Sequence, residues 1–327
     1  MTRISVIICV YNGGELFKKN IESVSRLKIP DDSWVEFLFV DNNATDGSGE
    51  LIRNYARRYP DTFYCLFEPK PGKTHALNLG IEKAKGEIIA FTDSDVVLPE
   101  DWLVRVREGF EEHDCAGLGG RVLPIWTENP PAWFTDEKDR EKRYAILALC
   151  GREESEYYPL KEGPLYPTGC NSAVKKKVFL KYGNYRTDLG VWPGLRLGGE
   201  DLEFFRRISE AGEKLYYHPR MTAYHQISKN RLEKKYFRKI SFSYLFGSLY
   251  MHPPCPNRKG EAFRKLISLP ENLLKFIVSG FNEKLTVRGN LHYRTMLKIT
   301  FCELGYRLFG QKKTVRLARA LGFIAKI

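Results

Sequence analysis

Two carboxylates, one residue apart, close an apolar run in the first third of the chain. Residues 88–95 read Ile-Ile-Ala-Phe-Thr-Asp-Ser-Asp. Because side chains alternate along a β-strand, a strand that stops here delivers Asp93 and Asp95 to the same side of its carboxyl end. Two hard oxygen donors suit Mg²⁺ or Mn²⁺, which shares its remaining coordination positions with phosphate oxygens. The pair therefore indicates metal-assisted chemistry on a phosphorylated substrate; the alternative is that both carboxylates cap a helix that begins near Pro99.

A second acidic pair follows two glycines at 198–201, where the chain reads Gly-Gly-Glu-Asp. The glycines allow the backbone to approach a ligand closely. We expect Glu200 and Asp201 in the first turn of a helix, where the helix dipole keeps a carboxylate ionised, as a general base must be before it accepts a proton. An acidic helix start without a catalytic role is the alternative.

Asp41 and two histidines are further candidates. Asp41 follows an apolar run, so its carboxylate is expected at the same sheet edge as Asp93, where it can bind a base or ribose; a turn residue is the alternative. His218 and His225 follow the acidic helix in strand-like sequence. A histidine here is either a metal ligand beside the aspartate pair or a packed side chain.

The elements that position these residues alternate between apolar runs and helical patterns. We expect strands at 4–10, 35–40, 63–67, 88–91 and 117–123, and helices at 15–27, 48–59, 74–85 and from Pro99 onward. Strand and helix repeated without hairpin signals predict an α/β fold with a mostly parallel sheet covered by helices. Such sheets bind ligands at the carboxyl ends of their strands, where the candidate carboxylates lie.

Residues 124–167 are rich in proline and aromatic side chains, and a long irregular stretch of this kind is usually a functional loop or lid. Trp126, Trp133 and Phe134 within it form either a stacking platform for a sugar ring or an anchor that fastens the loop to the core.

Composition excludes several classes of protein. With 327 residues and 43% hydrophobic content, the chain is long enough for a stable core and is not disordered. Its seven cysteines are odd in number and form no Cys-x-x-Cys pair, which indicates reduced thiols and argues against a cysteine-bound zinc. No window holds the ~18 to 20 apolar residues of a membrane span. We therefore expect a cytoplasmic protein, soluble or peripheral at the inner face of the cell membrane.

The basic charge is concentrated at the end of the chain. The net charge is +12, and from Ser228 onward 21 Lys and Arg stand against 5 Glu and no Asp, a balance of +16 that leaves −4 for residues 1–227. An excess this uneven usually faces a polyanion, either an anionic membrane or a nucleic acid. An expected amphipathic helix, with apolar residues between 266 and 278, either lies in a membrane interface or packs against its neighbours.

Four motifs together resemble a known family. They are Ser-Val-Ile-Ile-Cys-Val-Tyr-Asn at 5–12, Val-Asp-Asn-Asn-Ala-Thr-Asp-Gly-Ser at 40–48, the run at 86–95, and Gly-Glu-Asp at 199–201. In order and spacing they resemble a family 2 glycosyltransferase with the GT-A fold over roughly residues 1–240, whereas the helical tail is not covered. One departure is Asn42-Asn43, where the family more commonly has Asp-Gly.

The resemblance implies inverting transfer of a sugar, of the hexosyltransferase type, from a nucleotide-diphosphate donor with a divalent metal, Mg²⁺ or Mn²⁺. It implies that Asp201 is the catalytic base; Glu200 would hold the acceptor or a loop, or exchange roles with Asp201. The implied metal ligands are Asp93, Asp95 and His225. The implied donor-binding residues are Val10, Asn12, Asp41, Lys73, His75, Asp93 and Gly169, the last in a glycine loop at 167–171 beneath the donor sugar.

The expected organisation follows from these assignments. We expect a glycosyltransferase domain at 1–228, with a nucleotide-binding part at about 1–122 and an acceptor-loop and catalytic part at 123–228. The basic helical extension at 229–327 would contact a membrane surface or another subunit. A divalent ion can stabilise the diphosphate that leaves, so no protein acid is required, and a single displacement inverts the anomeric carbon.

The expected acceptor is a glycan or lipid-linked glycan in cell-surface polysaccharide synthesis. The alternative is a catalytically inactive protein that binds a nucleotide, or binds nucleic acid through its basic tail. The complete set of acidic residues argues against this alternative, so no nucleic acid partner is expected. A nucleotidyltransferase finds no support, because the sequence shows no Walker-type phosphate loop.

Overall fold

The computed structural model describes residues 1–137, 140–151, 156–157, 166–192, 195–237 and 240. The chain divides into two units, the first comprising residues 1–190 and 200–232 and the second residues 191–199 and 233–327. All candidate site residues lie in the first unit. The amphipathic helix expected around residues 266–278 lies outside the described residues.

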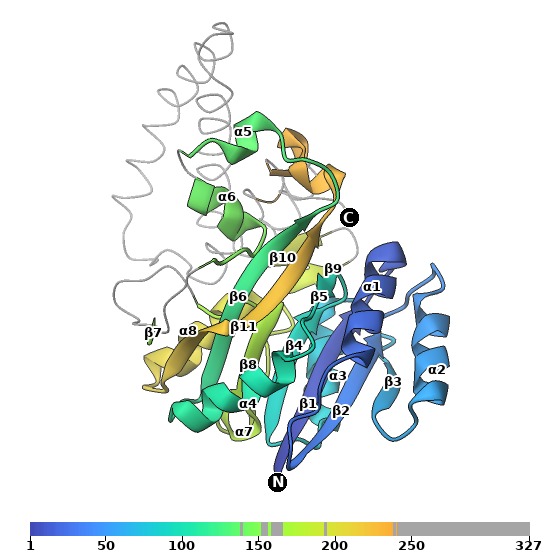
Figure 1. Ribbon diagram of the computed structural model, residues 1–327, viewed down its shortest axis with the longest axis vertical. Coiled ribbons are helices and arrows are strands. Elements are labelled where there is room, and N and C mark those ends of the chain that lie inside the picture. Colours follow the sequence, from blue (N-terminus) through green and yellow to red (C-terminus); the bar gives the residue numbers. More distant parts are fainter. Residues whose placement is uncertain (138–139, 152–155, 158–165, 193–194, 238–239, 241–327) are drawn as a thin grey trace, which may run out of the picture. The chain divides into compact units, whose positions relative to one another are not determined.

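A mixed sheet forms the centre of the first unit (Figure 1). Among the described residues its strand order is β3-β2-β1-β4-β8-β6-β11-β5, and β7 pairs with β11. The bounds are β1 Thr2–Val10, β2 Ser33–Asp41, β3 Phe63–Phe67, β4 Ile88–Asp93, β5 Val96–Val97, β6 Gly117–Trp126, β7 Glu156–Tyr157, β8 Asn171–Lys175 and β11 Leu215–Ile227. β1 pairs in parallel with β2 and β4, and β2 with β3, as predicted. β8, which no sequence pattern indicated, runs antiparallel between β4 and β6.

Helices follow the strands in the predicted order. Their bounds are α1 Gly14–Ser25, α2 Ser48–Arg58, α3 Lys73–Lys83, α4 Trp102–Glu112, α5 Ala132–Thr135, α6 Arg140–Ile146, α7 Lys176–Tyr182 and α8 Glu200–Glu210, with a short 3-10 helix η1 at Lys229–Leu232. α3 packs on β1 and β2, and α4 packs on β11. Residues 4–8 of β1 are all buried because helices cover both faces of the sheet, and all of them but Ser5 are apolar. The predicted α/β architecture is confirmed. A separate two-stranded sheet pairs β9 (Gly190–Trp192) with β10 (Leu195–Gly198).

Aromatic side chains anchor the start of the irregular segment that follows β6. Phe134 of α5 is fully buried and lies between Trp126 and Tyr144, with ring centroids 5.5 and 5.6 Å away. The sugar-platform hypothesis is therefore wrong for Phe134, which anchors the loop. Residues 152–155 and 158–165 of this segment lie outside the described part of the chain.

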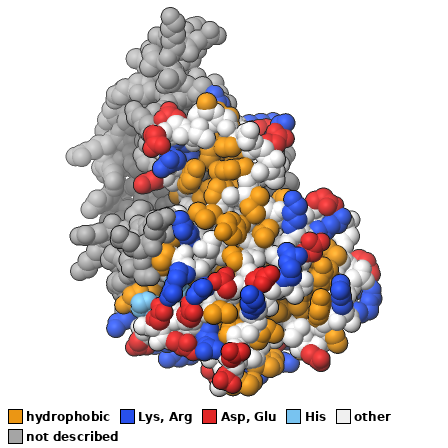
Figure 2. Space-filling model, in the orientation of Figure 1, with side chains coloured by type: hydrophobic (Ala, Val, Ile, Leu, Met, Phe, Trp, Pro, Cys, Tyr) orange, Lys and Arg blue, Asp and Glu red, His pale blue; other side chains and the backbone are white. Residues whose placement is uncertain are grey.

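Charges of both signs are interspersed over the face of the first unit seen in Figure 2, whereas hydrophobic side chains gather over the upper part of β6 and β11, where Ile125 is 36% exposed. This mixture agrees with the small negative balance of residues 1–227. Within the described residues, the cysteines at 9, 65, 115, 150 and 170 are free thiols. None of the helices described here is long and apolar enough to cross a bilayer.

Candidate active site

The carboxyl ends of three neighbouring strands meet at one edge of the sheet. β1 lies between β2 and β4, with Val10 level with Asp41 on one side and Cys9 level with Asp93 on the other. An open α/β sheet binds its ligand outside the strand at which the strand order reverses, which here is β1. The predicted common edge of Asp41 and Asp93 is confirmed.

Asp93 and Asp95 do not both belong to the strand. β4 ends at Asp93, and residues 94–95 form a turn before β5. Asn20 of α1 fixes this turn, because its Nδ2 donates to the Asp93 carbonyl (3.1 Å) and to the Val96 carbonyl (2.7 Å). The expectation that strand alternation aligns the two carboxylates is therefore wrong. The capping alternative is wrong as well, since α4 begins at Trp102 and no side chain caps it.

Lys73 is the partner of Asp93. It is the first residue of α3, and its Nζ lies 2.6 Å from Asp93 Oδ1. Burial disfavours the ammonium, but the charges of Asp93 and Glu200 outweigh burial and raise the pKa of Lys73. Lys73 therefore remains a cation.

Asp95 lies beside His225 and Arg231. β5 pairs antiparallel with β11, and the register of Val96 with His225 brings the turn to the imidazole. Asp95 Oδ2 lies 3.4 Å from His225 Nε2 and 2.7 Å from Arg231 Nη2. Burial opposes the carboxylate charge, but the Arg231 guanidinium, and with it the Lys73 ammonium, holds the pKa of Asp95 well below its usual range. Sequence analysis missed Arg231, because it read this arginine only as part of the basic tail.

The second acidic pair opens α8. The amides of Gly169 and Leu202 donate to Asp201 Oδ2 and Oδ1, each at 2.8 Å. Glu200 is 6% exposed, and burial together with the charge of Asp201 raises its pKa to about 7, although Lys73 acts in the opposite direction. The position at the helix start therefore does not keep Glu200 fully ionised at neutral pH.

Aromatic packing places the start of α8 beneath the end of β4. Phe204 of α8 stacks on Phe179 of α7 with ring centroids 4.6 Å apart, and Tyr185 meets Phe91 of β4 edge-on at 5.7 Å. Phe91 precedes Asp93 by two residues. The same cluster thus supports both acidic pairs.

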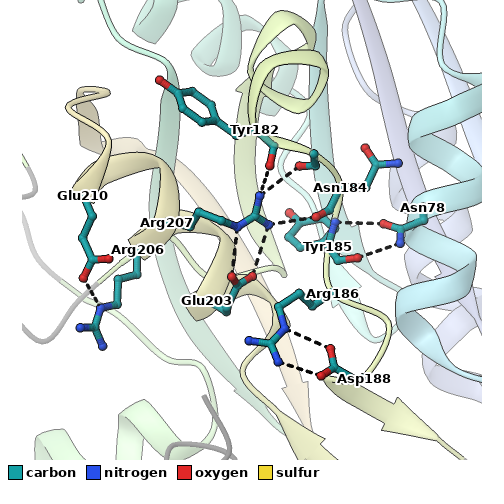
Figure 3. A network of polar contacts seen from close by, with 11 residues as sticks. Asn78, Tyr182, Asn184, Tyr185, Arg186, Asp188, Glu203, Arg206, Arg207 and Glu210 are labelled. Atoms are coloured by element: carbon teal, nitrogen blue, oxygen red, sulfur yellow. Dashed lines mark hydrogen bonds and ion pairs between the residues drawn. The ribbon is translucent and has the colours of Figure 1, made fainter. Parts of the chain in front are cut away.

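Polar contacts fasten α3 and α8 to the segment between α7 and β9 (Figure 3). Asn78 of α3 donates to the Tyr185 carbonyl (2.9 Å) and accepts from the Tyr185 amide (3.1 Å). Arg207 of α8 donates to Glu203 (3.0 Å), to the Asn184 carbonyl (2.9 Å) and to the carbonyl of Tyr182. The segment between α7 and β9 therefore links α3, which carries Lys73, to α8, which carries the second acidic pair.

Asn42 holds the segment that leads to Lys73. Its Nδ2 donates to the carbonyls of Glu68 (3.0 Å) and Lys70 (2.9 Å), and its Oδ1 accepts from the Gly72 amide (2.8 Å). Gly72 precedes α3 with a φ of 131°, a conformation that favours glycine. Because an amide supplies donors and an acceptor and a carboxylate supplies only acceptors, Asn suits this position and Asp does not. The departure from Asp-Gly therefore has a structural role that sequence analysis missed.

Two predicted nucleotide contacts already serve the fold. Asp41 is buried, and its Oδ1 accepts from the Ala44 amide at 2.9 Å, the turn contact given above as the alternative. Val10 is fully buried, and its carbonyl accepts from the Asn42 amide at 2.9 Å. Contact of either residue with a nucleoside stays a prediction.

The remaining candidates lie in different places. Asn12 has a φ of 48°, and its Oδ1 accepts from the Thr45 amide at 2.7 Å, which joins the loops that follow β1 and β2. His75 lies two residues after Lys73 and therefore on another face of α3; burial lowers its pKa, and Lys70 and Glu68 are the charges acting on it. His218 is 1% exposed, so the packing alternative holds for it. His225 is 5% exposed and lies beside Asp95, and its role as a metal ligand stays a prediction.

A divalent ion would find two converging ligands in the described residues. No group of three His, Cys, Asp or Glu side chains comes together in the part of the chain that the structure describes. Asp95 Oδ2 and His225 Nε2 do converge, and a carboxylate oxygen with an imidazole nitrogen suits a first-row divalent ion. Asp93 Oδ1 is turned to Lys73 instead. The residues fit a metal that completes its coordination with ligand oxygens once Arg231 has moved.

Comparison with known proteins adds to this geometry. The chain is 26% identical over 212 residues to the glycosyltransferase AglE of Haloferax volcanii, covering 65% of this chain and 63% of AglE. It is 25% identical over 239 residues to the glucosyl-dolichyl phosphate glucuronosyltransferase of Haloferax volcanii, covering 71% of each chain.

Among solved structures, the chain resembles the mannosyltransferase PcManGT from Pyrobaculum calidifontis, determined in complex with GDP-Man and Mn²⁺. The TM-score is 0.55 at 18% identity, over 98% of this chain and 76% of PcManGT. The predicted GT-A fold is confirmed. The sequence profile of glycosyl transferase family 2 matches residues 5–183, more than half of the chain. This protein therefore belongs to glycosyl transferase family 2.

Proposed function

We propose that the chain is an inverting glycosyltransferase that moves a hexosyl group from a nucleotide-diphosphate sugar to an acceptor hydroxyl. One observation carries the proposal: Lys73 pairs with Asp93 at 2.6 Å at the carboxyl edge of the sheet, near enough to Asp95, Glu200 and Asp201 for its charge to act on them as well. A diphosphate, a metal and a hydroxyl that must lose its proton require this combination of charges within one small region.

The donor side of the site contains cations for the diphosphate, Lys73 and Arg231. We assign Val10, Asn12, Asp41 and His75, at or near the ends of β1 and β2 and the start of α3, to the nucleoside. A divalent ion, Mg²⁺ or Mn²⁺, would be held by Asp95 and His225, with Asp93 joining it if Lys73 turned to phosphate. Bound there, it would neutralise the charge that develops on the leaving diphosphate.

Asp201 is the proposed base. The amides of Gly169 and Leu202 fix its carboxylate and leave one lone pair on each oxygen for an acceptor hydroxyl. Asp201 takes the acceptor proton as the acceptor oxygen attacks from the face opposite the diphosphate, and this single displacement inverts the anomeric carbon. We assign Glu200, partly protonated at neutral pH, to holding the acceptor.

We further propose a glycan or lipid-linked glycan as the acceptor, in cell-surface polysaccharide synthesis at the inner face of the membrane. The relative named as a glucosyl-dolichyl phosphate glucuronosyltransferase supports this class of acceptor. In our division, residues 1–228 form the transferase domain and 229–327 dock on anionic lipid, except that Arg231, at the start of this extension, belongs to the site of the transferase. Each cation near the lipid surface would contribute about 1 kcal/mol. Flotation with liposomes tests the docking, which fails if binding depends neither on anionic lipid nor on salt.

A panel of nucleotide sugars with Mg²⁺ or Mn²⁺ tests the reaction, with release of nucleoside diphosphate as the readout. Asp201→Asn should lower turnover by about 10²- to 10⁴-fold while donor binding is retained. Asp95→Ala should abolish activity through loss of the metal. Glu210→Gln, at the exposed far end of α8, is the matched control and should behave as wild type. Normal turnover by Asp201→Asn would refute the base assignment, and failure of every nucleotide sugar to bind would refute the function.

A further inference from the structure

Arg231 occupies the point at which a carboxylate and an imidazole converge. It lies in η1, six residues after His225, and its side chain returns to the turn after β4. Arg231 Nη2 lies 2.7 Å from Asp95 Oδ2, and Arg231 Nη1 lies 2.7 Å from His225 Nε2. The guanidinium therefore bridges the two atoms that would otherwise share a metal ion.

Hydrogen bonding defines the state of the imidazole. His225 Nδ1 lies 2.8 Å from the Leu147 carbonyl, which can only accept, so Nδ1 carries the proton of this bond. Nε2 accepts from Arg231, which can only donate. His225 thus presents to Arg231 the lone pair that a neutral histidine presents to a metal.

The cluster is largely shielded from solvent, so water replaces its charges only in part. The side chains of Asp95, His225 and Arg231 are 17%, 6% and 21% exposed. Leaving a shielded carboxylate without a cation is unfavourable, and so is moving a guanidinium away without an anion to receive it. Arg231 is therefore displaced from Asp95 most easily when a new cation and a new anion arrive together.

We propose that Arg231 keeps the divalent-ion position closed until a nucleoside diphosphate binds. Asp95 and His225 would then hold the metal, and the Arg231 guanidinium would pass to the diphosphate, which offers it a bidentate anion. This proposal rests on the proposed function for the identity of the anion. Metal and nucleotide should therefore increase each other's affinity. The metal supplies the positive charge that Asp95 loses when Arg231 moves, and the diphosphate supplies the negative charge that Arg231 then needs.

The proposal is tested by measuring the affinity of the full chain for Mn²⁺ by electron paramagnetic resonance, with and without UDP or GDP. Wild type should bind Mn²⁺ weakly alone and at least ~10-fold more tightly with the matching nucleotide, within the usual range of coupling. Arg231→Gln should bind Mn²⁺ alone at least ~10-fold more tightly than wild type, and its coupling to nucleotide should shrink.

Two further variants test whether the gain in Mn²⁺ affinity comes from vacating the metal position or merely from removing a positive charge. Lys229→Gln removes a cation from the same 3-10 helix, but Lys229 is 74% exposed and pairs with Glu128, so this variant should bind Mn²⁺ as wild type does. Arg231→Lys keeps the charge without the planar fork and should lie between wild type and Arg231→Gln. Thermal denaturation shows whether Arg231→Gln folds, and Arg231→Lys replaces it in the test if it does not.

Mn²⁺ affinity in Arg231→Gln that equals or falls below that of wild type without nucleotide would overturn the proposal, as would equal gains in Arg231→Gln and Lys229→Gln. Tighter Mn²⁺ binding by Arg231→Gln in a chain that uses no nucleotide sugar would uphold the closed position and refute the proposed function. Transfer activity in the wild-type chain, together with unchanged Mn²⁺ affinity in Arg231→Gln, would uphold the proposed function and refute the closed metal position.

Discussion

The buried carboxylate of Glu200 should weaken the fold as the pH rises. Burial and the charge of Asp201 raise the pKa of Glu200 from 4.5 to about 7 in the folded chain. Between these values the folded state binds more protons than the unfolded state, so the free energy of unfolding falls with rising pH and levels off above pH 7. Since one pKa unit corresponds to about 1.4 kcal/mol, the full loss amounts to about 3 kcal/mol.

Glu200→Gln removes this loss, because an amide of the same shape carries no charge. The free energy of unfolding of the variant, minus that of wild type, should increase by about 3 kcal/mol from pH 4.5 to pH 8, whatever its value at pH 4.5. Urea denaturation followed by tryptophan fluorescence, at half-unit steps of pH, measures it. The exposed Glu210→Gln on the same helix should show a constant difference.

Parallel stability curves for wild type and Glu200→Gln would refute the reasoning, since they would mean that Glu200 ionises in the folded chain as it does in the unfolded one. We expect the stabilised variant to lose transfer activity. A buried acid that has a pKa near neutrality and lowers the stability of the fold by this amount is typical of a functional site.

Two further perturbations follow from the same structure. Asn42→Asp removes the Nδ2 donor from the carbonyls of Glu68 and Lys70, so it should lower the free energy of unfolding by about 2 to 4 kcal/mol and weaken nucleotide binding. Asn43→Asp likewise removes a donor from the carbonyls of Glu68 and Pro69, but Asn43 is less buried, so this variant should cost less; equal losses would contradict the argument. Burial lowers the pKa of His218 from 6.5, so the folded chain should lose stability as the pH falls below 6.5; His218→Leu should reduce that loss in urea denaturation between pH 6.5 and 5, and an unchanged slope would count against it.

The sequence predicted the strands and helices of the first half of the chain because their signals are local. Buried runs such as residues 4–8 of β1 need only their own apolar side chains to be recognised. The same runs fix where each strand stops, and so they placed Asp41 and Asp93 at one edge before any contact was known. β8 escaped prediction because its place between β4 and β6 depends on partners distant in the chain.

The sequence by itself determined which acidic residues stand at the ends of strands and helices, since period and burial decide that. Only the tertiary structure decided what each of them faces. Asp95 and Arg231 are 136 residues apart, and no local pattern predicts that a turn and a 3-10 helix will bring them together. His218 and His225 lie on the same strand, yet packing around β11 buries the first away from the candidate site and sets the second beside a carboxylate and a guanidinium. The reason is physical: a pKa, a closed metal position or a fixed base depends on the charges and dipoles within a few ångströms, and those come from segments that only folding makes neighbours.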